Sequence, residues 1–387
     1  MKQEIVYSCK GDPTMQDEYM DFINYVFGFN GNGSDFYKLL PKLYKKEYNP
    51  CGSSYVVIDG GRIRAAIGAF DIGVEVCGEK LACRGIGNVA VHPFSRSKGY
   101  MKRLMEQALD DMVKDGVDFS VLGGRRQRYN YFSFDKGGSS YSFTVNSDNV
   151  RHCFGKDRAH RFEIRKVERN DTETLRRIAE LAAEKPYRAS RTERDLFDIL
   201  VSWRASVYAA FEGGNFAGYA IALDKRITES ATVKPSDYTD LIVCLYDSIA
   251  PGGKLDVTLP EFEQEHIRAL YAMTEGWLVT SNELYSVLNY RNTCAAFMRL
   301  KATYAKLPDG ELVIHIDGRA GEENLLFAVR DGVPSVERTD REPDLRLSHL
   351  DAERLIFASV SPDRLSLPSF AQLWFPLPIW MYSADMV

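Results

Sequence analysis

The sequence predicts a mixed α/β and α+β protein in three parts: two successive mixed sheets, the second degenerate, and a smaller C-terminal α+β part. Hairpin signals followed by a strand–helix–strand unit indicate the first sheet. A similar order of elements returns less clearly after residue 162, and the end of the chain alternates apolar and polar residues. We therefore expect domains at 1–148, 149–282 and 283–387.

The composition of the chain limits the classes of function that it can have. The chain of 387 residues is 45% hydrophobic and 27% charged, with a net charge of -5, so it offers no general attraction for nucleic acid. No apolar run approaches the roughly 20 residues that span a bilayer. The N-terminal residues lack the apolar core of a secretory signal. The seven scattered cysteines form no C-x-x-C pair, which predicts reduced thiols in a cytoplasmic protein.

The first part opens with helical spacing over residues 15–27. A glycine-rich loop at 28–33 follows a helix instead of a strand, so it is not a dinucleotide-binding fingerprint. Gly60-Gly61 lies between two apolar runs and predicts a hairpin of 54–59 with 62–77. A turn at 78–79 then leads into a third strand over 80–91.

The segment VAVHPFSRSKGYMKRLM, residues 89–105, passes from strand to cationic loop to helix. Apolar residues recur every three or four positions from Gly99 to about Gly116, and a strand follows at 117–122. A helix N-terminus exposes unpaired N–H groups that suit a pyrophosphate, Arg96 and Lys98 add positive charge, and Gly99 permits close approach. The alternative is an ordinary solvated turn between a strand and a helix.

In the second part, the sequence predicts a strand at 162–168, a helix at 172–184 and a hairpin over 206–222 around Gly213-Gly214. It has no Arg-x-x-Gly between strand and helix, and residues 145–161 are predicted as a linker. The last part predicts three strands and a helix, and its apolar tail WFPLPIWMYSADMV is expected to dock against the protein. These strands are at 311–317, 324–330 and 344–348, and the helix is at 350–359.

Two motifs resemble those of the GCN5-related N-acetyltransferases (GNAT). Residues 96–101, RSKGYM, resemble motif A, R/Q-x-x-G-x-G/A, although Met101 stands where that motif has a small residue. Residues 129–134, YNYFSF, resemble the later segment Y-x-x-F-G-F/Y, with Ser133 in place of glycine. The order of the three parts resembles the enhanced intracellular survival (Eis) family over essentially the full chain, which implies tandem GNAT-type sheets and a sterol-carrier-like C-terminal domain.

The resemblance implies acetyl transfer from acetyl-CoA to a primary amine by direct attack in a ternary complex. The amine would be a polyamine, a lysine or an aminoglycoside-like compound. Tyr129 would be the general acid, with Tyr131 as the competing candidate, and the C-terminal carboxylate of Val387 would be the base or amine anchor. The alternative for the tail is a purely structural role. The six histidines show no H-x-x-x-H pair, so we expect no metal.

Binding residues are carried over from the same resemblance. The strand end and the start of the helix would bind acetyl-CoA, and the early aromatic loop would border the acceptor, where Asp35 would attract a cation or would simply be a surface acid. Members of the family form hexamers, which implies a homo-oligomer. The competing function is a non-catalytic acyl-CoA or lipid-binding protein with a vestigial transferase half. The implied acetyl-CoA residues are Val89, Ala90, Val91, Arg96, Ser97, Lys98, Gly99, Tyr100 and Met101; the implied acceptor residues are Phe27, Phe29, Asp35 and Phe36.

Overall fold

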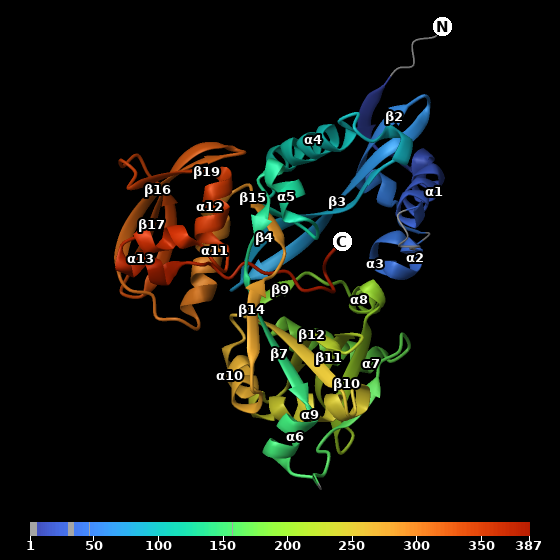
Figure 1. The fold of residues 1–387 in the computed structure, drawn as a ribbon, viewed down its shortest axis with the longest axis vertical. Helices are drawn as coiled ribbons and strands as arrows, with labels where there is room; N and C mark the ends of the chain where they lie inside the picture. The colour runs from blue at the N-terminus through green and yellow to red at the C-terminus, as the bar shows by residue number, and fades with distance from the viewer. Residues whose placement is uncertain (1–5, 30–34, 46, 157) are drawn as a thin grey trace.

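Three β-sheets organise the chain in the computed structural model, which describes residues 6–29, 35–45, 47–156 and 158–387. Figure 1 shows them as three lobes: the first is mainly blue to cyan, the second mainly green to yellow and the third orange to red. The predicted mixed α/β and α+β class is confirmed. The glycine-rich loop predicted at 28–33 lies largely outside the described residues.

The first sheet has the order β1-β2-β3-β4-β5-β15-β6, with β9 paired to the far end of β3. The predicted hairpin is β2–β3, and Gly60 and Gly61 both have positive φ, as its two-residue turn requires. The strands are β1 (Tyr7–Lys10), β2 (Ser54–Asp59), β3 (Arg62–Val76), β4 (Glu79–Val91), β5 (Phe119–Leu122), β6 (Asp135–Lys136), β9 (Tyr187–Ala189) and β15 (Leu284–Val287).

Helices cover both faces of this sheet. The apolar stripe predicted after Gly99 lies on α4 (Tyr100–Lys114), where Leu104, Met105, Ala108 and Leu109 are fully buried on one face. The opposite face is covered by α1 (Gln16–Phe27) and the short helices α2 (Phe36–Leu39) and α3 (Pro41–Tyr44). The short helix α5 (Arg126–Tyr129) follows β5.

The second sheet has the order β14-β7-β13-β12-β11-β10-β8 and repeats the plan of the first. Strands β10, β11 and β12 form an antiparallel meander, and α9 (Tyr238–Ile249) crosses to the parallel strand β13, as α4 crosses from β4 to β5. The strands are β7 (Ser139–Asn146), β8 (Glu163–Lys166), β10 (Ser206–Glu212), β11 (Asn215–Leu223), β12 (Arg226–Thr232), β13 (Lys254–Pro260) and β14 (Trp277–Ser281); the other helices are α6 (Ser147–Phe154), α7 (Thr172–Ala183), α8 (Leu196–Leu200) and α10 (Gln264–Met273).

The two sheets exchange one strand each. Strand β7 leaves the first sheet and pairs between β13 and β14, whereas β15, which follows β14 in the chain, returns to the first sheet and pairs between β5 and β6. The predicted boundary at 148/149 therefore falls after a strand of the second sheet and inside α6. The predicted boundary at 282/283 falls just before a strand of the first sheet, so sheet membership does not follow these two boundaries, and the domain division itself stays a prediction.

The linker predicted at 145–161 is wrong over its first half, because α6 occupies residues 147–154. Asn146 accepts hydrogen bonds from the backbone N–H groups of Asp148 and Asn149, and the Asn149 side chain accepts one from the Asn146 N–H. This reciprocal capping box starts a helix that the composition of the segment did not suggest.

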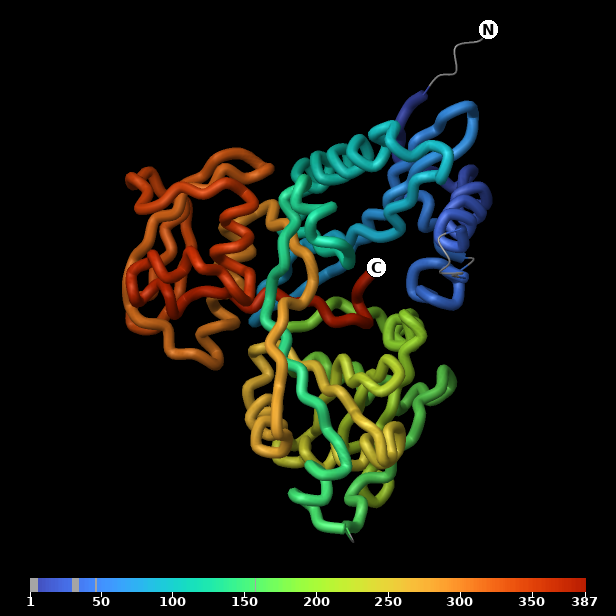
Figure 2. Tube along the Cα trace, viewed as in Figure 1, coloured from blue at the N-terminus to red at the C-terminus, as the bar shows by residue number. Residues whose placement is uncertain are grey.

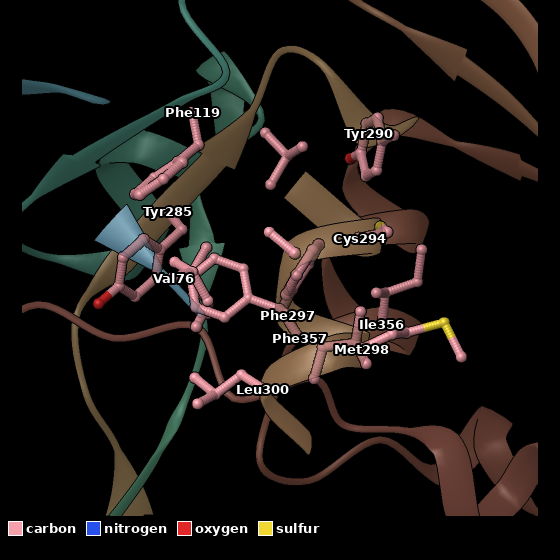
Figure 3. Close-up of a cluster of buried hydrophobic side chains, with 14 of the residues drawn as sticks. Val76, Phe119, Tyr285, Tyr290, Cys294, Phe297, Met298, Leu300, Ile356 and Phe357 are labelled. Carbon is pink, nitrogen blue, oxygen red and sulfur yellow. The ribbon is translucent and has the colours of Figure 1, made fainter. Parts of the chain in front are cut away.

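The third sheet, β18-β17-β16-β19, packs against the first through one large apolar core. Figure 3 shows Phe297 of α11 (Tyr290–Ala302) beside Phe119 and Tyr285 of the first sheet, and the Phe119 and Phe297 ring centroids are 6.2 Å apart. The strands are β16 (Gly310–Gly318), β17 (Gly321–Arg330), β18 (Val333–Arg338) and β19 (Leu345–Ser348), and the other helices are α12 (His349–Ile356) and α13 (Ser369–Trp374). The sequence predicted all three other strands but missed β18, which contains Pro334 at an edge.

The C-terminal tail runs back from the third lobe and ends between the first and second sheets, as the red end of the tube in Figure 2 shows. Trp380, Met381 and Tyr382 are buried along this path, and the Tyr187 hydroxyl donates to the Trp380 carbonyl. Near the end of the tail, Lys42 Nζ of α3 donates to the Ala384 carbonyl at 2.7 Å. None of the helices in the described ranges combines the length and apolar character that a membrane-crossing segment needs.

The lysine beside the tail generates a pH prediction. Burial lowers the pKa of Lys42 from 10.5 to about 7, with Asp385 opposing the shift. Between these two values the unfolded chain binds more protons than the folded one, so this residue makes the free energy of unfolding rise with pH from about 7 upward. We expect Lys42→Met to show a smaller rise between pH 7 and pH 9 than the wild type in denaturant titrations. Equal rises in both proteins would contradict this pKa.

Candidate functional site

A cleft opens where β4 and β5 part. The two strands pair in parallel over residues 83–85 and 119–121, and this ladder stops at Gly85 while β4 continues to Val91. A register shift against β3, with Asn88 at positive φ, accompanies this parting. The edge of β4 that faces the cleft, including Val89, Ala90 and Val91, thus has no β5 partner within the described residues.

The cleft leads into a cavity of about 730 Å³. Its walls come from β4, from the glycines that follow β5, from α1 and α2, from the second part of the chain and from the last residues of the tail. Lining side chains include Tyr129, Phe27, Phe36 and the terminal Val387. The remaining lining residues are Leu39, Ile86, Gly87, Asn88, Val89, Gly123, Gly124, Arg125, Arg128, Trp203, Leu223, Glu283, Ser383 and Met386.

The predicted anion loop, residues 96–99, immediately precedes α4. Gly99 is the N-cap with φ of 77°, and a Cβ placed there would meet no atom within 4 Å, so the space before the helix is open. Arg96, Ser97 and Lys98 are exposed. Lys98 Nζ lies 3.0 Å from the Asp59 carboxylate, which also accepts a 2.5 Å hydrogen bond from Tyr100. Lys98 is therefore already paired with an acid of β2, so the backbone N–H groups at the start of α4 are better candidates than Lys98 for contact with an anion.

The chain's carboxyl end lies against β4. A Cβ on Gly87 would come within 3.0 Å of the carboxyl carbon of Val387, and the Val387 side chain borders Gly85. Trp203 Nε1 donates to the carbonyl of Met386 at 3.1 Å. Two glycines thus make room for the terminus at the point where the β4–β5 ladder ends.

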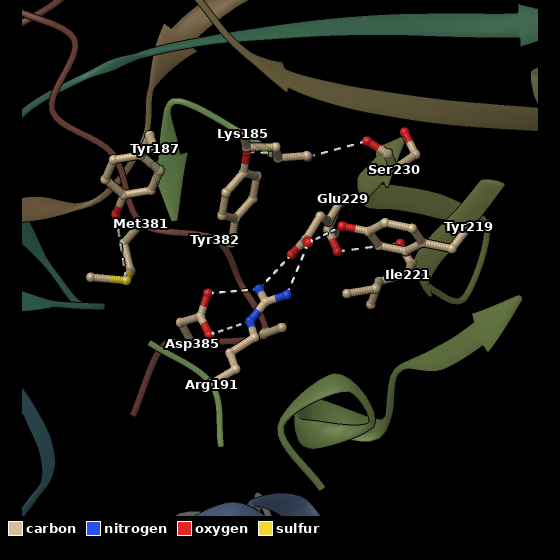
Figure 4. Close-up of polar contacts among 12 residues, drawn as sticks. Lys185, Tyr187, Arg191, Tyr219, Ile221, Glu229, Ser230, Met381, Tyr382 and Asp385 are labelled. Carbon is tan, nitrogen blue, oxygen red and sulfur yellow. Dashed lines mark hydrogen bonds and ion pairs between the residues drawn. The ribbon is translucent and has the colours of Figure 1, made fainter. Parts of the chain in front are cut away.

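Asp385 fixes the same segment through ion pairs. Arg191 donates to both Asp385 oxygens, at 2.9 and 2.8 Å, and to both Glu229 oxygens, at 2.9 and 2.6 Å. The Tyr219 hydroxyl adds a 2.6 Å hydrogen bond to Glu229. Figure 4 shows the Arg191 guanidinium between the two carboxylates. Glu229 and Asp385 are buried, the Arg191 side chain is only 9% exposed, and each charge is paired, as burial requires.

The two competing tyrosines lie in different surroundings. Tyr129 ends α5, lines the cavity and is 5% exposed, whereas Tyr131 is 87% exposed and does not line the cavity. Burial raises the pKa of Tyr129 above that of a free phenol, and Arg128 opposes the shift. The Tyr129 hydroxyl is therefore protonated at neutral pH, as a proton donor must be.

The residues expected to border the acceptor divide into two pairs. Phe27 and Phe36 line the cavity, with ring centroids 5.1 Å apart. Phe29 is 55% exposed and is absent from the lining. The Asp35 carboxylate caps α2 by accepting from the Tyr37 N–H at 3.1 Å, and it pairs with Lys38, so its visible role is structural.

Sequence reasoning missed several groups in the cavity. Trp203 and Glu283 come from segments that the sequence did not single out, and Gly85 and Gly87 were not recognised as the space for the terminus. Burial raises the pKa of Glu283, with Lys136 and Arg226 opposing the shift. Among the side chains that the structure describes, no group of three or more His, Cys, Asp or Glu is arranged to hold a metal ion.

Comparisons with known proteins agree with this geometry. Residues 12–134 match the family model described as an acetyltransferase (GNAT) domain. A search of curated protein sequences finds no match. Solved structures of similar fold include a GCN5-related N-acetyltransferase from Anabaena variabilis, 13% identical, with a TM-score of 0.67 over 98% of each chain. A GCN5-related N-acetyltransferase from Kribbella flavida is 17% identical, with a TM-score of 0.60 over 89% of this chain and 87% of that one.

Eis1 from Mycobacterium abscessus also has a similar fold: it is 14% identical, with a TM-score of 0.59 over 90% of this chain and 88% of that one. At such identities the likeness of these structures concerns the fold. The family match is the finding that bears on the activity of the first part, because it covers both the anion loop and Tyr129. The chain therefore carries a GNAT acetyltransferase domain at residues 12–134, within a longer fold that these solved structures share.

Proposed function

We propose that the protein acetylates a primary amine, which attacks acetyl-CoA directly in a ternary complex. The observation that supports this is one cavity, opening from the β4–β5 cleft, that is lined by both Tyr129 and the chain's carboxyl end. A proton donor and a carboxylate are thereby available at the place where a thioester would meet an amine.

The residues present fit acetyl-CoA, which when bound supplies the thioester carbonyl that the amine attacks. The free edge of β4 at Val89, Ala90 and Val91 offers backbone groups to a pantetheine arm. The first N–H groups of α4, preceded by Arg96, Ser97, Lys98 and Gly99 and followed along the helix by Tyr100 and Met101, suit its pyrophosphate.

Tyr129 is the general acid in this proposal. When the amine nitrogen forms its bond to the acetyl carbon, the C–S bond breaks and the sulfur leaves as a thiolate. Tyr129 donates its hydroxyl proton to that sulfur and regains one from solvent. A thiol with a pKa near 8.5 and a phenol near 10 are close enough for this transfer.

The Val387 carboxylate is the amine anchor and proton acceptor. A terminal carboxylate with a pKa near 3.5 is a weak base toward an alkylammonium near 10.4 in water. In a cavity that limits water it still stabilises the cation that forms on the nitrogen after attack. The proton then passes from the product nitrogen to this carboxylate and on to solvent.

The acceptor is a primary amine of the polyamine, lysine or aminoglycoside-like type. Phe27 and Phe36 give its pocket an aromatic wall, and Glu283 adds a second carboxylate to the lining beside that of Val387. Two carboxylates favour a cationic acceptor over an anionic one.

Other features of the proposal rest on the resemblance to the Eis family. They are membership of that family, a sterol-carrier-like third part, a cytoplasmic location and assembly into a homo-oligomer. The second candidate function, a non-catalytic acyl-CoA or lipid-binding protein, has no specific observation in its favour. The anion loop and Tyr129 at the cavity favour catalysis instead.

Thiol release tests the function directly. Incubating the protein with acetyl-CoA and a panel of polyamines, lysine and aminoglycosides should release free thiol with at least one amine, and mass spectrometry should find the acetylated product. Acetyl-CoA binding without release for any amine of the panel would overturn the catalytic proposal.

Replacing the proton donor gives a second test. We expect Tyr129→Phe to lower kcat by on the order of 10²-fold, because the thiolate must then leave unprotonated, with little change in acetyl-CoA affinity. Tyr131→Phe is the matched control and should keep wild-type kcat, since Tyr131 is exposed outside the cavity. A larger loss of kcat in Tyr131→Phe than in Tyr129→Phe would show that Tyr131 is the general acid.

Moving the terminal carboxylate gives a third test. One glycine appended after Val387 displaces the carboxylate by about 3.5 Å while every native residue is retained. We expect kcat/KM for the amine to fall at least tenfold, because the charge no longer lies beside the acceptor nitrogen. Calorimetry should show unchanged acetyl-CoA binding. Full activity of the extended protein would show that the tail only packs.

A further inference from the structure

Trp203 has a strained backbone at the edge of the cavity. It lies in the short 3-10 segment Ser202–Arg204. Trp203 has φ of 62° and ψ of 23°, and Arg204 follows with φ of 64°. Bulky residues rarely adopt this left-handed conformation, and two in succession persist only where the surroundings hold them. Neither residue takes part in the reaction proposed above, so this strain calls for another explanation.

The Trp203 indole connects the second part of the chain to the terminus. Its Nε1 donates to the Met386 carbonyl, and its ring lines the cavity together with Val387. The Met386 carbonyl belongs to the peptide unit that carries the nitrogen of Val387. A hydrogen bond to this carbonyl therefore restrains the last peptide plane of the chain, and with it the direction of the terminal carboxylate.

The two preceding residues are held as well. Lys42 donates to the Ala384 carbonyl, and Arg191 binds Asp385 through both oxygens while Glu229 holds Arg191 from the other side (Figure 4). Three consecutive residues thus have one specific polar partner each. Free chain ends usually fray, so this arrangement is more than packing requires.

We propose that Trp203 and Arg191 are positioning residues for the Val387 carboxylate, and that the second part of the chain is the docking site for the chain's own end. The proposal rests on the proposed role of that carboxylate in catalysis. A shift of about 1 Å in such a group is enough to slow a reaction by up to 10²-fold, so restraint of the terminus has a catalytic consequence.

Carboxypeptidase Y tests the docking independently of any activity. Trp203→Phe removes the indole donor and leaves most of the ring, and Trp374→Phe is its matched control. Trp374 is buried, whereas Trp203 is partly buried, and Trp374 likewise donates to a backbone carbonyl, that of Pro308 at 2.9 Å, in the third part of the chain. We expect the terminal residues of Trp203→Phe to be released roughly fivefold faster than those of wild type or Trp374→Phe, followed by intact mass. Equal release from the two tryptophan variants overturns the proposal.

Asp385→Asn supplies a second variant, because removal of the buried Arg191 would leave Glu229 uncompensated and endanger folding. It should release its terminal residues faster than Trp374→Phe does, and release as slow as that of wild type would exclude Arg191 from the docking. In the amine assay, Trp203→Phe and Asp385→Asn should each raise KM for the amine and lower kcat several-fold, while acetyl-CoA binding is unchanged.

The carboxypeptidase experiment and the amine assay test the docking of the terminus and the catalytic proposal separately. If the wild type acetylates no amine, the catalytic proposal fails, and carboxypeptidase release alone decides the docking. If release rises in Trp203→Phe but its amine kinetics match those of Trp374→Phe, the terminus is docked without being positioned for catalysis, and the proposed positioning role is wrong.

Discussion

The end of the β4–β5 ladder at Gly85 is the constraint on which the rest of the site depends. Up to that residue the two strands pair as ordinary parallel neighbours, and beyond it their backbones separate. A parted sheet leaves polar backbone groups that need partners. One side of the opening receives the chain terminus against Gly87, and the free edge of β4 leads toward the start of α4. The same parting thus creates both the binding cleft and the seat of the terminal carboxylate.

Reciprocal strand exchange makes this opening rigid. Because β7 leaves the first sheet to complete the second and β15 follows β14 of the second sheet back into the first, backbone ladders connect the two sheets through the chain. The third part adds the apolar core around Phe297, and the tail that begins there crosses to the cavity. The site around the terminus is formed by three parts of the chain. The terminus keeps a fixed position there only if these parts do not move against each other, and the exchanged strands restrict such movement.

Local patterns in the sequence predicted local structure well. Gly60-Gly61 predicted a hairpin and the apolar stripe after Gly99 predicted α4, because both signals arise within a few residues. The strand exchange could not be predicted, since the alternation of a strand does not name its partner. Asp35 illustrates the same limit at the site: its sequence context is compatible with an acceptor contact, whereas its carboxylate caps α2. Trp203 carries no motif, and only the folded chain brings it to Met386.

The two sheets of similar plan differ at the start of the helix that crosses between their parallel strands. In the first, α4 follows Gly99 with an open approach to its N-terminus. In the second, Asp237 precedes α9 without capping it, and its carboxylate lies 2.8 Å from Arg161, so an ion pair of the protein lies at that end of the helix. The second part instead contacts the end of the chain, where Arg191 donates to Asp385 and Trp203 donates to the Met386 carbonyl. Where the first part has an open helix N-terminus, the second thus offers polar partners to the chain's own terminus.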